Sequence, residues 1–284
     1  MLSAACIGAF FAACAERGNN RGAEHKRDST VAADSAIVTG DWPAELGAAF
    51  VVPSDTENLA VVLYPTTAGA AGSVGASLTL VSSSGDTVRR QVGLQVQDSL
   101  HCGDATIARL TRATPLSWSI GMQSTAAIPL RTDSMDALSA ADSTLYSAEM
   151  ARLASAVNAE QPSRFTGLPF TLATLRRFRT DGREVVVSQV VRRVNQEADP
   201  LEERTMIVAE RGTAATERFT SVHGSRSDGN EDNTDHFDLL AALRTAHGTL
   251  LVLAREKPTG TLFEILERDT SGAWTVKWSR SIGC

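Results

Sequence analysis

Short runs of β-forming residues, separated by polar turn residues, recur along most of the chain and predict β-strands. In the first half the runs cover residues 49–52, 59–64, 77–81, 88–96, 107–110 and 116–120. In the second half they cover residues 170–179, 183–194, 203–210, 217–222, 239–243, 249–255, 261–267 and 274–279. The chain is therefore expected to be mainly β.

The turn Thr180-Asp181-Gly182 stands between two of these runs. An Asp-Gly turn in that position favours a β-hairpin. Strand spacing of roughly 8 to 12 residues predicts an antiparallel meander that forms a sandwich or a partial barrel. A propeller-like arrangement stays open, because no internal repeat of fixed period is evident.

One segment has helical rather than strand periodicity. Leu145, Met150, Leu153 and Val157 recur at near-helical spacing and predict a helix over residues 140–158. Pro162 follows closely, and the residue before a proline is disfavoured in a helix. The expected fold class is thus mainly β with one helix (α+β).

The first 14 residues form an uncharged apolar run that is too short to span a bilayer and is typical of a secretory signal. Its last residues, Phe11-Ala12-Ala13-Cys14, resemble the lipobox of bacterial lipoproteins. The resemblance implies that residues 1–13 are a signal peptide and that Cys14 carries a lipid at the mature N-terminus. A cut before Cys6 would leave almost no apolar segment. The alternative interpretation is an ordinary apolar helix.

Composition divides the rest of the chain into a tether and a body. Residues 14–40 are polar and lack apolar periodicity, which is typical of a flexible tether. We expect a β-rich region over residues 41–160 that ends in the helix, and an antiparallel β region over residues 161–284, as one domain or two. With 43% hydrophobic residues, 21% charged residues and a net charge of −6, a globular body is expected and nucleic acid is not an expected partner.

Two cysteines lie beyond the lipobox in the body, Cys102 and Cys284. In an oxidising compartment two such cysteines pair, so the sequence favours a disulfide between them. Two separate buried thiols are the alternative.

The acidic segment from Asp228 to His236 is the strongest candidate for chemistry. Asp228, Asn230 and Asp232 match the first oxygen ligands of an EF-hand loop. The pattern then fails, because Asn233 replaces the turn glycine and Leu239 replaces the bidentate Glu. We therefore expect no bound metal and no cofactor, and interpret residues 227–238 as an exposed connection whose carboxylates face water.

Two tryptophans of one strand and a group of charged residues on two others each invite a structural and a functional interpretation. Trp274 and Trp278 are four residues apart in a strand and are expected to share a face, where they either line a ligand groove or fill the core. Arg192-Arg193 on one strand either meets acidic partners or forms cross-strand ion pairs with Glu202 and Glu203, which open the next strand, and the cross-strand pairs are expected.

These observations favour an exported lipoprotein of the bacterial cell envelope, facing the periplasm or the exterior. Its membrane contact is the lipid anchor, and its body is a non-catalytic protein that binds an envelope protein or organises a surface assembly. One alternative is a hydrolase whose site includes Asp228, Asp232, Asp235 and His236. Another is a small-ligand binder that uses the tryptophans.

The lipid assignment predicts that protein expressed in a bacterial host begins at Cys14 and carries acyl chains. Mass spectrometry of the intact protein measures both. A Cys14→Ala variant is expected to lose the acyl chains and leave the membrane fraction. Retention of both by the variant would contradict the assignment.

Overall fold

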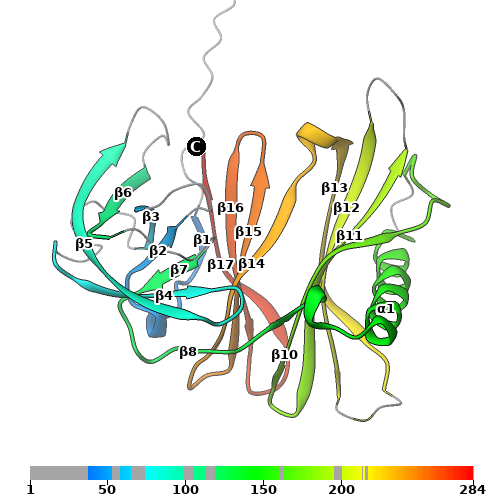
Figure 1. Ribbon diagram of the computed structural model, residues 1–284, viewed down its shortest axis with the longest axis horizontal. Coiled ribbons are helices and arrows are strands. Elements are labelled where there is room, and N and C mark those ends of the chain that lie inside the picture. The colour runs from blue at the N-terminus through cyan, green and yellow to red at the C-terminus, as the bar shows by residue number, and fades with distance from the viewer. Residues whose placement is uncertain are drawn as a thin grey trace, which may run out of the picture. The chain divides into compact units, whose positions relative to one another are not determined.

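The structure of the chain is a computed structural model, drawn in Figure 1. The residues that it describes are 38–52, 58–64, 74–98, 105–112, 119–159, 163–194, 200–212, 214 and 217–283. They are mostly antiparallel β-strand with one α-helix, which confirms the fold class expected from the sequence. Their strands form a closed barrel and two further sheets rather than the repeated blades of a propeller.

The strands from β2 to β7 close into an antiparallel barrel of the order β2-β3-β6-β5-β4-β7. Its strands are β2 (Ala49–Val52), β3 (Leu59–Tyr64), β4 (Ser77–Ser82), β5 (Thr87–Asp98), β6 (Ala105–Leu110) and β7 (Ser119–Met122). Phe50, Leu80 and Leu110 belong to the apolar cluster that the barrel's own strands share. Val51 belongs to a different cluster, outside the barrel. All of β2 is buried because its two faces lie in these two clusters.

A second sheet, called the central sheet, has the order β1-β17-β16-β15-β14-β8. Its strands are β1 (Val38–Gly40), β8 (Ile128–Pro129), β14 (His236–Arg244), β15 (Thr249–Lys257), β16 (Gly260–Arg268) and β17 (Trp274–Ile282). The third, called the outer sheet, has the order β13-β12-β11-β10-β9. Its strands are β9 (Asp133–Ser134), β10 (Thr171–Thr180), β11 (Arg183–Val194), β12 (Leu201–Gly212) and β13 (Thr220–Asn230).

The central sheet is apolar on both faces. On β15, Leu250 and Val252 pack in the cluster shared with the barrel, whereas Leu251 and Leu253 pack in the cluster shared with the outer sheet. Successive side chains of a strand point to opposite faces, so an uninterrupted apolar run needs a partner on each side. The barrel and the outer sheet are those partners.

Helix α1 (Ala140–Ala159) covers the remaining face of the outer sheet (Figure 1). Tyr146, Met150 and Leu153 are buried against strand residues such as Val186. At the start of the helix, the hydroxyl of Ser139 accepts a hydrogen bond from the backbone N–H of Asp142 at 3.1 Å, which is the usual N-cap arrangement. The helix expected over residues 140–158 is confirmed, and it packs on the sheet that follows it in the chain.

The beginning of the described chain is a strand rather than tether. Val38–Gly40 pairs with β17, although the sequence placed these residues at the end of a flexible tether. An extended backbone beside a free sheet edge gains ladder hydrogen bonds whatever its side chains are. The other residues of the expected tether lie outside the described residues.

The expected hairpin at Asp181-Gly182 is confirmed. Both residues have positive φ, 48° and 69°, and they join β10 to β11. Short 3₁₀ turns complete the described elements, at Ala44–Leu46 (η1), Met135–Ala137 (η2) and Glu231–Asn233 (η3).

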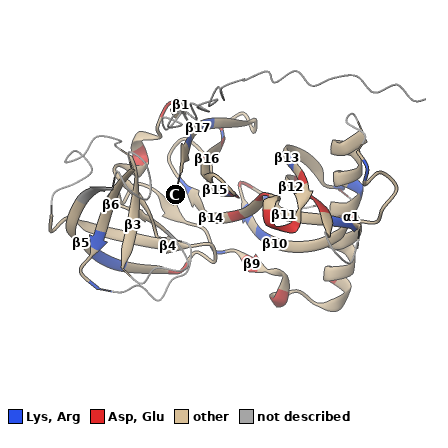
Figure 2. Ribbon diagram, turned by 90° about the horizontal axis from the view of Figure 1, so that it is seen from above, with Lys and Arg blue, Asp and Glu red and all other residues tan. Residues whose placement is uncertain are grey.

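A buried ion-pair network joins β11, β12 and β13 of the outer sheet near the C-terminal end of helix α1. The expected cross-strand pairs are confirmed within it. The carboxylate of Glu203 is fully buried and accepts hydrogen bonds from Arg192 Nε at 2.7 Å and Ser163 Oγ at 2.7 Å. Arg226 Nε lies 3.2 Å away, and Asn158 from the helix also donates. The charged positions near β11 and β12 are coloured in Figure 2.

Replacing Glu203 by Ala should lower the free energy of unfolding by about 3 to 5 kcal/mol, because it leaves the buried Arg192 without its counter-charge. Chemical denaturation measures the loss.

Glu217→Ala is the matched control. Glu217 is 46% exposed and 3.9 Å from Arg183, so its removal should change stability by less than about 0.5 kcal/mol. Equal losses in the two variants would contradict a structural role for the network.

Candidate functional site

The central and outer sheets face each other, and a short crossing segment covers only part of their open side. β8 pairs with the end of β14, and β9 pairs with β10, so residues 128–134 run from one sheet to the other. Within this segment the backbone N–H of Leu130 donates to Ala242 O at 2.8 Å, and its side chain packs against the cluster between the sheets. We call residues 128–134 the strap. Beyond the strap, the edges of β10 and β14 stay uncovered by any described strand.

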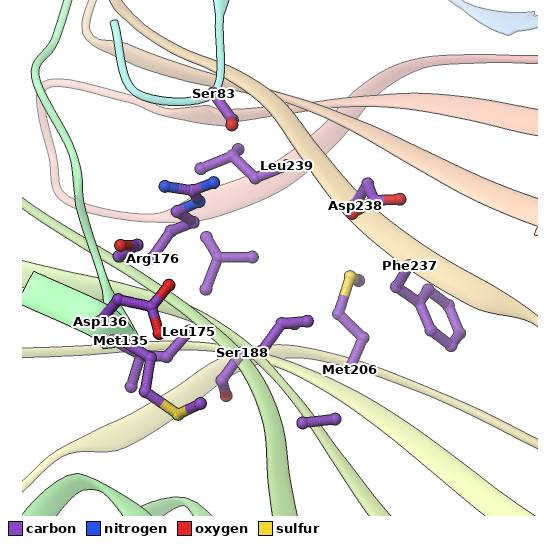
Figure 3. Close-up of a pocket in the computed structure, with 14 residues that line it drawn as sticks. Ser83, Met135, Asp136, Leu175, Arg176, Ser188, Met206, Phe237, Asp238 and Leu239 are labelled. Carbon is purple, nitrogen blue, oxygen red and sulfur yellow. The ribbon is translucent and has the colours of Figure 1, made fainter. Parts of the chain in front are cut away.

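A cavity of about 280 Å³ lies at this uncovered part of the sandwich, and we call it the edge pocket (Figure 3). Its apolar floor comes from the cluster between the sheets and consists of Val187, Met206, Phe237 and Leu239. Its polar rim includes Ser83 of the turn between β4 and β5, Asp136 of η2, Arg176 of β10 and Asp238 of β14. Small-molecule sites commonly combine an apolar lining with a few polar groups in this way.

The rim carries opposite charges that do not pair with each other. Within the described part of the chain, neither Arg176, Asp136 nor Asp238 has an ion-pair partner. Figure 3 shows Arg176 and Asp136 on one side of the pocket and Asp238 on the strand opposite. Asp238 is paired with Ala254, which packs beside the barrel, so the side chain of Asp238 lies on the face of β14 opposite to the pocket floor.

The environment of Asp238 acts on the ionisation of its carboxyl in two opposite directions. Burial raises the pKa of its carboxyl above the ordinary value, although the positive charges of His236 and Arg176 pull the pKa in the other direction. Arg176 is therefore close enough to act on Asp238 electrostatically without forming an ion pair.

Two further polar side chains of β11 belong to the surroundings of the pocket. Ser188 is 2% exposed, lines the pocket, and its hydroxyl has no hydrogen-bond partner among the described residues. Gln189 accepts a hydrogen bond from the backbone N–H of Phe237 at 3.0 Å. The amide of Gln189 thereby satisfies an edge N–H of β14 that would otherwise face the open side.

The acidic segment forms a shorter connection between strands than the sequence predicted. β13 continues through Asn230 and β14 starts at His236, so Asp228 and Asn230 are strand residues and Asp232 lies in the 3₁₀ turn. The strand expected over residues 217–222 therefore extends much further. Its polar residues pair with β12 along most of that strand, and this pairing overrides their turn preference.

The carboxylates of this segment have different surroundings. Asp228 and Asp232 are exposed, as expected. Asp235 is 6% exposed and forms an ion pair with Arg255, so the expectation that it faces water is wrong. Burial is tolerated there because the guanidinium neutralises the carboxylate.

The members of this segment do not converge on one point. His236 Nδ1 lies 2.8 Å from a guanidinium nitrogen of Arg204, and burial together with the Arg204 charge lowers its pKa. Across the described residues no group of three or more His, Cys, Asp or Glu side chains is arranged to hold a metal ion. Asp228, Asn230 and Asp232 are thus not joined by further acidic ligands.

Trp274 and Trp278 lie on opposite faces of β17, which corrects the expectation of a shared face. Trp278 pairs with Ile265 and Val276 with Leu266, so Lys277 is the extra residue of a β-bulge and reverses the alternation. Trp278 is 1% exposed in the cluster beside the barrel. Trp274 packs toward the outer sheet, where its indole N–H donates to Glu210 at 3.0 Å. A groove over both rings is not formed.

Other sequence predictions fall outside the described residues. They are the lipidated Cys14 and the disulfide between Cys102 and Cys284. No helix among the described residues combines the length and apolar character needed to cross a bilayer.

The sequence interpretation missed the edge pocket, although one signal pointed to it. Arg176 pairs with Val187 and Phe178 pairs with Val185, so both lie on the face of β10 that meets the central sheet. A charged residue two positions from a buried aromatic residue marks a break in the apolar face. Comparison with protein-family models, curated proteins and solved structures gives no match.

The raised pKa of Asp238 predicts a stabilising effect of Asp238→Asn at neutral pH. A carboxyl whose pKa is higher in the folded than in the unfolded protein destabilises the fold once the pH exceeds the unfolded value, about 3.9. The variant should therefore be more stable than the parent at pH 7, and the difference should shrink as the pH falls toward that value.

Urea denaturation at several pH values measures the difference. Asp232→Asn, at an exposed position, is the control and should give no comparable gain. A pH-independent loss of stability in Asp238→Asn would contradict this interpretation.

Proposed function

We propose that the protein is a membrane-anchored, non-catalytic binding protein whose edge pocket takes a small ligand. The observation that carries the proposal is a cavity with an apolar floor between two sheets, whose rim holds charges of both signs without ion-pair partners among the described residues. Arg176 and Asp238 are partly buried, and unpaired charges in such positions are costly for a fold. A ligand that pairs with them would offset that cost.

The chemistry around the pocket supports binding rather than catalysis. A serine nucleophile needs a base within hydrogen-bond distance. Ser188 has no such partner among the described residues, and His236 Nδ1 is occupied by Arg204. The hydrolase alternative, built on Asp228, Asp232, Asp235 and His236, gains no support from these contacts.

The anchor belongs to the same proposal and is supported by the sequence of residues 1–14. A lipid on Cys14 would fix the protein to a membrane of the bacterial cell envelope. The body would then bind its ligand in the periplasm or at the exterior.

The methionines provide a direct test of ligand binding, because the chain has only five. Met135 and Met206 line the edge pocket, whereas Met122 and Met150 are buried elsewhere, beside the barrel and under the helix. Methyl NMR of the full chain labelled at methionine reports on both regions at once, with signals assigned by single Met→Leu substitutions.

The probe is a library of small fragments that carry one apolar and one charged group. We expect several fragments at millimolar concentration to shift the Met135 and Met206 signals and to leave those of Met122 and Met150 in place. A library in which no member shifts the two pocket signals selectively would refute the binding function.

A further inference from the structure

We propose that a basic hollow on the barrel is a second ligand site and binds a phosphate group. The hollow is formed by β4, β5 and the bend that follows β6, and its volume is about 340 Å³. The residues that line it are Ser77, Arg89, Arg90, Gln91, Thr111 and Arg112. We call it the arginine hollow. Figure 2 colours its arginines on β5 blue. It shares no lining residue with the edge pocket, so this inference does not depend on the function proposed for that pocket.

The strand register brings several polar side chains of the hollow onto one face of the barrel wall. Ser77 pairs with Gln91, and the backbone N–H of Thr111 donates to Gln91 O at 3.0 Å. Arg89 is two residues from Gln91 in the same strand, so both side chains point to the same face. Leu78, the neighbour of Ser77, belongs to the apolar cluster of the barrel. The face that carries Ser77, Arg89 and Gln91 is therefore the outer one.

The other two arginines reach the hollow from different backbone positions. Thr111 and Arg112 lie in a bend after β6, where the alternation of strand side chains ends, and Arg112 is exposed. Arg90 pairs with Leu78 and starts from the inner face, but its guanidinium turns back and donates to the backbone carbonyl of Arg89 at 2.8 Å. All three arginines consequently border one hollow.

The hollow lacks the counter-charges that arginines have elsewhere in the protein. In the outer sheet, Arg192 and Arg211 each lie 2.7 Å from a glutamate oxygen. In the described part of the chain, by contrast, Arg89 and Arg112 have no ion-pair partner, and no acidic residue lines the hollow. Like charges gathered on neighbouring strands repel each other and cost stability. A bound anion would offset this repulsion.

The number and kind of donors favour phosphate over a carboxylate. Besides the guanidinium groups, the hydroxyls of Ser77 and Thr111 and the amide of Gln91 offer O–H and N–H donors to the hollow. A phosphate monoester carries a charge between about −1.5 and −2 at neutral pH and three strong acceptor oxygens, so it can use several donors at once. A carboxylate carries one charge on two oxygens. The planar fork of arginine matches phosphate oxygens in a bidentate arrangement.

The size and exposure of the hollow indicate how a ligand enters it. Its volume of about 340 Å³ is at the lower end of the range for small-molecule sites, about 300 to 1,000 Å³. Ser77, Arg89 and Gln91 are exposed, so the phosphate group enters while the rest of the ligand stays in solvent. Soluble phosphate esters and the headgroups of phospholipids share this chemistry, and the experiments below distinguish the two sources.

An NMR titration of the full chain, labelled at arginine, tests the site directly. The probes are inorganic phosphate and glycerol 3-phosphate, added at constant ionic strength, with signals assigned by single Arg→Gln substitutions. Both probes should shift the side-chain N–H signals of Arg89 and Arg112 and leave that of Arg244, on β14, in place. Acetate, a carboxylate, should cause no comparable shift. Equal shifts of all three arginine signals would overturn the proposal, because they would reflect general screening of surface charge.

Variants connect the binding to the residues. Arg89→Gln and Arg112→Gln should each weaken glycerol 3-phosphate binding about tenfold or more, the effect of losing a hydrogen bond to a charged group. Arg112→Lys should keep part of the affinity, because it retains the charge but not the planar fork. Arg244→Gln is the matched control, since Arg244 is also exposed and without an ion-pair partner among the described residues. It should bind like the parent, and an equal loss in all variants would overturn the proposal. Circular dichroism should show every variant folded.

Vesicles distinguish a lipid headgroup from a soluble ester. The Cys14→Ala chain, which should lack the lipid anchor, is mixed with vesicles of phosphatidylcholine alone or of phosphatidylcholine with phosphatidic acid, whose headgroup is a phosphate monoester. Sedimentation with the second kind only, lost in Arg112→Gln, would identify a lipid headgroup as the source. Binding of glycerol 3-phosphate without sedimentation would identify a soluble ester. If neither compound nor vesicle binds, the phosphate site is refuted, whereas the edge pocket is tested separately by the methionine signals.

Discussion

The fold depends on a central sheet that is apolar on both faces. Residues such as Leu250 and Leu251 are neighbours in sequence, yet one packs beside the barrel and the other beside the outer sheet. Because neither face can be left in water without a large loss of hydrophobic stabilisation, the barrel and the outer sheet must both be in place. The outer sheet in turn has a second apolar face, which the helix covers.

β-Bulges in the central sheet determine which of its side chains face the barrel and which face the outer sheet. In β14 the bulge near Leu240 lets Leu239 face the outer sheet while Leu240 and Ala241 both belong to the cluster beside the barrel. In β17 the bulge at Lys277 lets Trp274 face the outer sheet while Trp278 packs beside the barrel. Each bulge changes which face receives the following side chains, and so adjusts one strand to two different partners.

Stacking two sheets leaves an open side, and the candidate site follows from how that side is closed. The strap covers one part of it and places Leu130 against the apolar interior. In the remaining part, polar and charged residues such as Arg176 and Asp238 border an apolar floor. A fold optimised for stability alone would have filled this gap or paired these charges, and binding sites are where proteins retain such departures.

Local sequence patterns predicted much of the fold. The strands over residues 59–64 and 183–194 and the ion pair between Arg192 and Glu203 need only strand periodicity and a neighbouring strand. The opposite faces of Trp274 and Trp278 were not predictable, because a bulge depends on pairing with the next strand. The edge pocket was not predictable either, since it joins residues from six separate segments between Ser83 and Leu239 that meet only in the folded chain.

A crystal structure of the protein, purified after expression in bacteria and without added ligand, would show whether the edge pocket is a binding site. We expect a small bound molecule in the edge pocket, with a negatively charged group on the guanidinium of Arg176 and an apolar group beside Met206. An Arg176 side chain paired with Asp136 or Asp238, over a pocket closed by the protein's own side chains, would contradict it.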